Sequence, residues 1–141
     1  MAKRNRWRTK EAVKIAEKAG LKALCEGAEA ILTEAIDETP VETGTLRRSG
    51  TVTVGALPDS EQVFEDARAG TEQEQGQEKG REQAVYVSFN TPYARRQHEE
   101  LDYEHPKGGK AKYLEDPFLR NKTKVLKYVE AQIRKILRSE G

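Results

Sequence analysis

The feature that most constrains this chain is a long run of helical periodicity that stops at a proline. Apolar residues recur at spacings of mostly three and four between Thr9 and Asp37, which is the pattern of one buried helix face. Thr9 suits an N-cap, and Thr39-Pro40 ends the pattern because the residue before a proline avoids the α region. Gly20 and Gly27 interrupt the run, which predicts a bend or a close contact in a long N-terminal helix.

The rest of the chain predicts strands and a second helix. Val52 and Val54 alternate with threonines, and "AVYVSFN" (84–90) is rich in β-branched and aromatic residues, so both segments are expected to be strands. Residues 91–100 are expected to be a further strand or a short helix. Asp116 and the proline after it open a C-terminal helix, whose apolar residues form a stripe. Because no β–α–β alternation appears, we predict an α+β fold with a small, mainly antiparallel sheet and the C-terminal helix packed on it.

Charge is sorted along the chain although the formal net charge is only +1. The length fits one domain over residues 1–141, with a basic tail at 1–8. Residues 57–83 hold eight acidic and three basic residues, which predicts a long acidic loop, mobile apart from a short strand or turn near 62–64. Residues 103–141 hold ten basic and five acidic residues. This distribution favours contacts between unlike charges on different subunits.

The composition predicts a small core. Hydrophobic and charged residues each make up 35% of the chain, so a folded subunit is expected to complete its burial against neighbours. Cys25 is the only cysteine and lies among leucines, which predicts a buried, unreactive thiol. No apolar run follows the basic start or approaches the length of a membrane span, so we expect neither a secretion signal nor a membrane segment.

Few residues offer catalytic chemistry. His98, Glu99 and His105, with Asp102 and Glu104 between them, have the side chains to ligate zinc or to act as acid and base. Their spacing does not match the His-Glu-x-x-His order that places two imidazoles on one helix face. We therefore expect a polar loop, no catalytic or metal-binding residues, no cofactor and no enzymatic activity. A small metal-dependent hydrolase stays as the alternative from another class.

DNA binding is a further alternative. Residues 1–10 and 107–127 are basic, and Trp7, Tyr113 and Tyr128 are available for stacking on bases. The acidic segment opposes this function, and the sequence has no helix-turn-helix, zinc or RNA-binding signature. We expect no specific reader of DNA sequence.

Three short motifs resemble those of a known family. "VETGTLRRS" (41–49) resembles a Val-Asp/Glu-Thr-Gly-x-Leu-Arg-x-Ser motif, and "TPYARRQHE" (91–99) resembles a Tyr-Ala-x-x-x-Glu segment. "KYLEDPF" (112–118) resembles a closing segment in which Pro-Phe/Leu opens the last helix. Over residues 9–138 the order and approximate spacing are similar to those of small neck, head–tail joining and tail-completion proteins, or tail components, of long-tailed bacteriophages. The acidic insert at 57–83 is longer than that family's pattern.

The resemblance implies a structural virion protein that is assembled in the host cytoplasm. It implies a homo-oligomeric ring, with six-fold symmetry as the first expectation, at the neck between the capsid connector and the tail tube. The ring completes the tail and leaves a channel through which DNA passes as cargo. A tail terminator ring that caps the tail tube is the alternative role. The implied partners are neighbouring neck, connector and tail-tube proteins, and no membrane is involved.

The same resemblance gives the junction after the first helix a structural role. Pro40 stops the helix, Gly44 makes the turn and Leu46 enters the core. The residues expected to contact other subunits or partners are Arg47, Arg48, Tyr93, Arg95, Arg96, His98, Glu99 and Tyr113.

Overall fold

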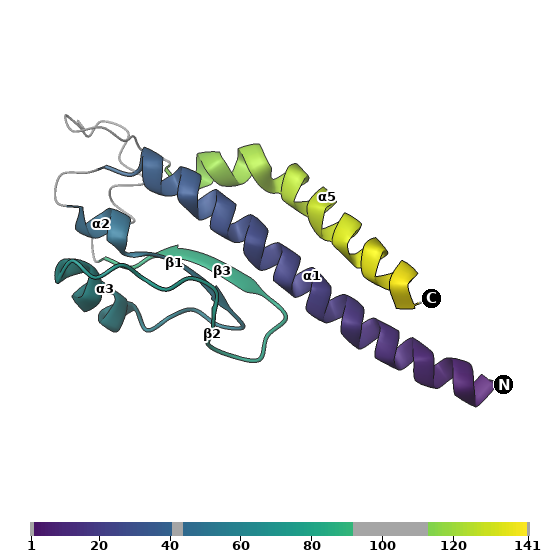
Figure 1. The fold of residues 1–141 in the computed structure, drawn as a ribbon. Coiled ribbons are helices and arrows are strands. Elements are labelled where there is room, and N and C mark those ends of the chain that lie inside the picture. Colours follow the sequence, from purple (N-terminus) through teal and green to yellow (C-terminus); the bar gives the residue numbers. More distant parts are fainter. Residues whose placement is uncertain (1, 41–43, 92–112, 141) are drawn as a thin grey trace.

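The computed structural model describes residues 2–40, 44–91 and 113–140 (Figure 1). In chain order the elements are α1 (Ala2–Glu38), α2 (Thr45–Arg48), β1 (Gly50–Val54), α3 (Ser60–Arg68), β2 (Gln77–Glu78), β3 (Val85–Phe89) and α5 (Glu115–Glu140). The predicted α+β fold is confirmed, with a long N-terminal helix, a small sheet and a C-terminal helix.

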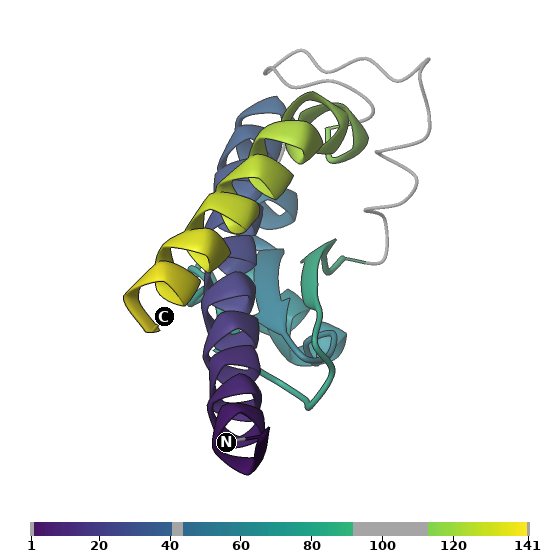
Figure 2. The ribbon, with the colours of Figure 1, turned by 90° about the vertical axis from the view of Figure 1, so that its right-hand side faces the viewer.

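The elements form layers around α1. α5 runs along one side of α1, the sheet lies on the other side, and α3 lies beyond the sheet (Figures 1 and 2). α1 and α5 are antiparallel, since Gly27 lies against Val125 and Gly20 lies against Ile133. Both glycines therefore mark close helix contacts, one of the two possibilities that the sequence left open. α5 and α3 are the outermost helices on opposite sides of the molecule.

The first helix is longer than the sequence pattern indicates. It begins at Ala2, so residues 2–8, predicted to be a basic tail, belong to α1. Lysine and arginine are good helix formers, and extending an existing helix costs far less than nucleating one. Its end is where the sequence places it. The Thr39 amide donates to the Ile36 carbonyl at 3.2 Å, and the Thr39 hydroxyl donates to the Ala35 carbonyl.

The sheet has the order β2-β1-β3. β1 pairs antiparallel with β3 from Gly50↔Phe89 to Val54↔Val85, and parallel with the two-residue β2. Successive side chains of β1 point to opposite faces. Val52 packs against Ala28 and Leu32 of α1, while Thr51 and Thr53 face α3. Both faces of β1 are covered, which is why its threonines are buried.

Residues 57–83 are ordered to a greater degree than the sequence indicates. They contain α3 and β2, so the prediction of a mobile loop with a strand or turn near 62–64 is wrong for this part of the chain. Asp59 is the N-cap of α3 and accepts a hydrogen bond from the Gln62 amide at 3.2 Å. Val63 and Ala67, four residues apart, are buried. These two positions anchor α3 although the segment has few apolar residues.

A glutamine side chain helps to hold the return from α3 against the sheet. The Val52 amide donates to Gln75 Oε1 at 2.6 Å, and Gln75 Nε2 donates to the Gly50 carbonyl at 3.0 Å. From the next residue on, the backbone itself pairs with β1, since the Gly76 amide donates to the Val52 carbonyl at 2.7 Å. The Gln75 amide group thus occupies the place of a strand residue just before β2.

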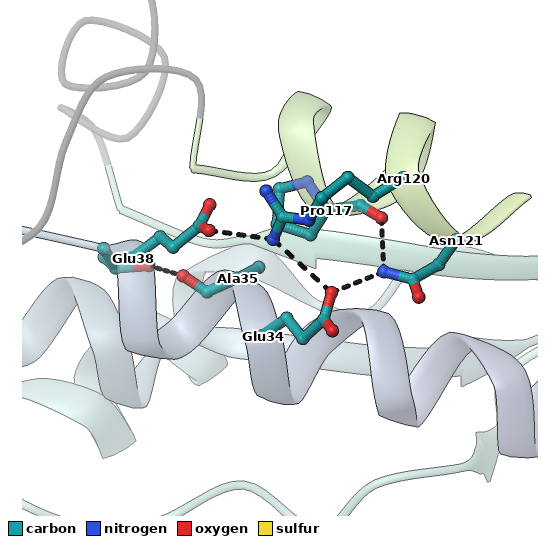
Figure 3. A network of polar contacts seen from close by, with 7 residues as sticks. Glu34, Ala35, Glu38, Pro117, Arg120 and Asn121 are labelled. Carbon is teal, nitrogen blue, oxygen red and sulfur yellow. Dashed lines mark hydrogen bonds and ion pairs between the residues drawn. The ribbon is translucent and has the colours of Figure 1, made fainter.

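Polar contacts join the start of α5 to the end of α1 (Figure 3). Arg120 Nη2 lies 2.8 Å from Glu38 and 3.5 Å from Glu34. Asn121 donates to Glu34 and also to the Pro117 carbonyl. Exposed pairs of this kind add little stability each, but together they fix where α5 begins along α1.

An aromatic contact joins the residue before α5 to the sheet. The rings of Tyr113 and Phe89 meet edge to face, with centroids 5.0 Å apart. Leu46 of α2 and Leu114 complete this cluster, so Leu46 enters the core as predicted. A second apolar cluster is formed by Ala28, Leu32 and Val52. Cys25 packs against this cluster and is only partly buried.

Candidate functional site

Arg47 holds the C-terminal end of α1. Its Nε donates to the Thr39 carbonyl at 2.9 Å, and its Nη2 donates to the Asp37 carbonyl at 3.1 Å. A cation at this end of a helix meets carbonyls that have no partner within the helix. The side chain is half-buried. Arg47 therefore closes the joint between α1 and α2 within one subunit.

Arg48 holds the C-terminal end of α3. Its Nε donates to the Ala67 carbonyl at 2.8 Å. Gly44 makes room for it, because a Cβ at residue 44 would lie 2.8 Å from Arg48 Nη1 and the glycine has φ 77°. The adjacent arginines thus tie two helix ends to the short helix α2. Sequence reasoning singled out both residues but not these intrachain partners.

Tyr113 is a core residue of this subunit. Its side chain is 1% exposed, which leaves almost no surface for a neighbour. The remaining predicted contact residues lie outside the described residues, as do the residues of the alternative metal site. The contact residues concerned are Tyr93, Arg95, Arg96, His98 and Glu99, and the metal-site residues are His98, Glu99 and His105.

No group of three histidine, cysteine, aspartate or glutamate side chains in residues 2–40, 44–91 and 113–140 is placed to hold a metal ion. None of the described helices has a stretch long and apolar enough to cross a bilayer.

An apolar groove opens between the first half of α1 and the second half of α5. Its volume is about 660 Å³. The α1 side includes Val13, Ala16 and Leu24, and the α5 side includes Val129 and Ile133. Val13 is 48% exposed although it lines this groove. The side of α1 that faces α5 is thus only partly covered near Val13.

A row of exposed leucines on α5 continues this apolar surface. Leu119, Leu126 and Leu137 lie at spacings of seven and eleven, which places them on one side of the helix. Leu126 is 61% exposed. Leu137 also lines the groove, so the groove and the row are continuous. We call this continuous surface the apolar face.

The sequence pattern did not separate these leucines from the buried stripe of α5. Val125, Val129 and Ile133 face α1, where they meet Gly27 and Gly20. At about 100° per residue, the leucines lie on average about 70° further around the helix. A helical wheel of residues 115–140 carries this signal, because the apolar arc is wider than one helix contact can cover.

Comparison with known proteins identifies the family. Residues 8–116 match the family HK97-gp10_like, described as "Bacteriophage HK97-gp10, putative tail-component". The chain belongs to this family. No curated protein and no solved structure matches it significantly. The match includes α1 from residue 8 onwards, the Arg47 and Arg48 junction, the sheet and the first two residues of α5.

Family membership gives the apolar face a context. A tail component is a structural protein of the phage particle that contacts other virion proteins. In a charge-rich subunit, a continuous exposed apolar surface marks an interaction site. The apolar face is therefore the candidate assembly surface of this tail component.

Proposed function

We propose that the chain forms a ring, with six subunits as the expected number, at the neck between capsid connector and tail. In this role the ring completes the tail, offers a docking surface to the connector and leaves a channel for DNA. The protein acts without catalysis, cofactor or metal. Assembly would take place in the host cytoplasm, before the particle is complete.

The observation that carries the proposal is the apolar face. Val13, Leu126 and Leu137 are each more than 40% exposed in the single chain. A ring subunit has two neighbours, and contact with them would bury such side chains and stabilise the fold. The free energy would come mainly from removing apolar surface from water, at roughly 25 cal/mol per Å².

The deciding measurement is the mass of the purified full chain, first alone and then with isolated tails or connector-bearing capsids. We expect a ring either in solution or as a stoichiometric complex on the particle. Leu126→Asp should prevent ring formation while the helical circular dichroism spectrum stays unchanged, and Lys18→Asp serves as the control on an exposed position of α1. A chain that stays monomeric and binds neither tails nor capsids would overturn the proposal.

The same experiment separates the neck role from the terminator role. A neck completion ring should require the connector side or bind both particles. Binding to purified tail tubes without capsids would instead assign the chain to the tail terminator ring. Both roles use the apolar face between subunits, so the Leu126→Asp result applies to either.

A further inference from the structure

The outer side of α5 carries a row of basic residues. Between Phe118 and Ser139 the helix has seven basic residues and one acidic residue, Glu130, which is ion-paired with Arg134. Five of the basic residues follow one another at spacings of four, three, seven and four, which keeps them on one side of the helix. They are Arg120, Lys124, Lys127, Arg134 and Arg138, all exposed, and we call them the basic face.

Acidic residues gather on the opposite side of the molecule. A cleft of about 280 Å³ lies between α3 and residues 72–79, and its charged lining residues are four carboxylates and one lysine: Asp59, Asp66, Glu72, Glu74 and Lys79. Further carboxylates stand around it on exposed positions. We call the whole set the acidic face; it comprises Asp59, Glu61, Glu65, Asp66, Glu72, Glu74 and Glu78.

The two faces cannot neutralise each other within one subunit. α1 and the sheet lie between α5 and α3 (Figures 1 and 2). Among the described residues, the ion pairs of the two faces stay on their own side of the molecule: Arg120 pairs with Glu34 and Glu38 of α1, Arg134 pairs with Glu130 of α5, and Glu65 pairs with Arg68 of α3. Because most of these side chains are exposed, most of this charge faces outwards.

We infer that the basic face of one subunit docks on the acidic face of a second copy of this chain. The inference rests on the proposed ring and specifies which surfaces meet. A two-fold contact would bring one face against itself, which places like charges together. A head-to-tail contact pairs unlike charges at every interface. Such a contact closes into a ring when the rotation that relates neighbouring subunits is a whole-number fraction of a full turn.

Apolar groups support the same pairing. The row Leu119, Leu126 and Leu137 borders the basic face on α5, about one quarter-turn away on the helix. Beside the acidic face, Leu57 is 59% exposed just before α3. The contact thus combines exposed apolar side chains with a charged border on each partner. Charged borders govern orientation and association rate, while apolar side chains supply most of the affinity.

The test reverses the charge of each face separately and then together. The first variant is Lys124→Glu/Lys127→Glu on α5, and the second is Glu72→Lys/Glu74→Lys on the acidic face, all at exposed positions. The third variant carries all four changes. The control is Lys14→Glu/Lys18→Glu. It changes the net charge by the same amount as the first variant, at exposed positions of α1 that belong to neither face. Ring formation is measured as mass in solution and as copies bound per tail.

Each double variant should form no rings, or its subunits should associate about tenfold or more weakly, because like charges then meet at every interface. The fourfold variant should regain it, because its faces are complementary again. An equimolar mixture of the two double variants should also assemble, with the variants alternating around a ring of even subunit number. The α1 control should assemble like the wild type.

The outcomes separate this inference from the proposed function. Wild-type rings with unaffected double variants would overturn the pairing of faces and leave the ring intact. Loss in the double variants without recovery in the fourfold variant or the mixture would also overturn the pairing. A wild-type chain that forms no ring alone or on particles would overturn both. Circular dichroism and thermal melting confirm that each variant is folded before it is scored.

Discussion

Gly27 of α1 and Val125 of α5 are in such close contact that a Cβ at residue 27 would lie 2.5 Å from Val125 Cγ1. The same added atom would also lie 3.0 Å from Cγ2 and 3.2 Å from Cβ of that valine. A β-branched side chain has few alternative rotamers in a helix, so Val125 has little freedom to move away. Glycine at residue 27 therefore sets how closely the two long helices approach.

We expect Gly27→Ala to lower the free energy of unfolding. Overpacking costs about 1–3 kcal/mol, while alanine in place of glycine returns about 1 kcal/mol of helix propensity. Gly20→Ala is the matched comparison, because its nearest neighbour is the flexible end of Ile133, with Cδ1 at 3.0 Å. That variant should be neutral or more stable by up to about 1 kcal/mol. Urea denaturation of both variants measures the contrast.

A double variant checks the cause. Val125→Ala removes the two nearest of the three atoms that meet the added Cβ, so Gly27→Ala should cost less in the Val125→Ala background than in the wild type. Equal costs in both backgrounds would show that Val125 is not the obstacle.

Gln75 offers a second prediction. Gln75→Ala leaves the Val52 amide and the Gly50 carbonyl without their side-chain partner, and Val52 is fully buried. An unsatisfied buried backbone group costs about 1–3 kcal/mol. Gln77→Ala is the control, since its exposed side chain only donates to Glu74 at 3.2 Å and should change stability by less than about 0.5 kcal/mol. A similar loss in both variants would contradict the role of Gln75 as a stand-in for a strand residue.

The Gln75 contact also shows what the sequence could and could not predict. Periodicity located α1, β1, β3 and α5 because their buried faces carry many apolar residues. Residues 57–83 bury only a few side chains, and composition alone indicated disorder. One local signal was present: Asp59 followed three residues later by Gln62 is the start pattern of a helix. The pairing of Gln75 with β1 depends on tertiary placement, which no local pattern contains.

The candidate site was predictable to a similar extent. The three motifs taken together, one of which contains Arg47 and Arg48, indicated the family, and the uneven charge along the chain indicated two surfaces. The sequence did not reveal that Tyr113 is buried by Phe89 and Leu46, because an isolated tyrosine after several basic residues suits a surface equally well. It also did not reveal which apolar residues of α5 remain exposed, since that depends on where α1 lies.

Arg47 and Arg48 give a third prediction. Arg47→Ala and Arg48→Ala should each lower stability by about 1–3 kcal/mol, because carbonyls at the ends of α1 and α3 lose a charged donor. Arg47→Lys should fall between wild type and alanine, since lysine keeps the charge but lacks the fork that reaches Thr39 and Asp37 together. Thermal and urea denaturation measure this order.

Ring formation by the same variants tests the role that the resemblance gave these residues. If the arginines act only within the subunit, variants that remain folded should assemble normally at low temperature. Variants with wild-type stability that fail to assemble would instead support direct contact with a neighbour.

Cys25 gives a prediction about pH. Burial raises the pKa of the Cys25 thiol, and the carboxylates of Glu29 and Glu26 raise the pKa further. A raised pKa means less thiolate at a given pH, and the thiolate is the form that reacts. Alkylation by iodoacetamide should therefore reach half its maximal rate at a pH above about 8.5, the usual value for a free thiol.

Glu29→Gln tests the electrostatic part of this shift. Removing that negative charge should lower the pKa, so the midpoint of the alkylation profile should move towards the usual value while part of the shift due to burial stays. Glu11→Gln is the control. Glu11 is exposed and lies about four helical turns from Cys25 on α1, so this variant should leave the midpoint unchanged. The midpoint is the proper readout, because limited access to a partly buried thiol lowers the rate at every pH without moving the midpoint. A wild-type midpoint at or below the usual value would contradict the prediction.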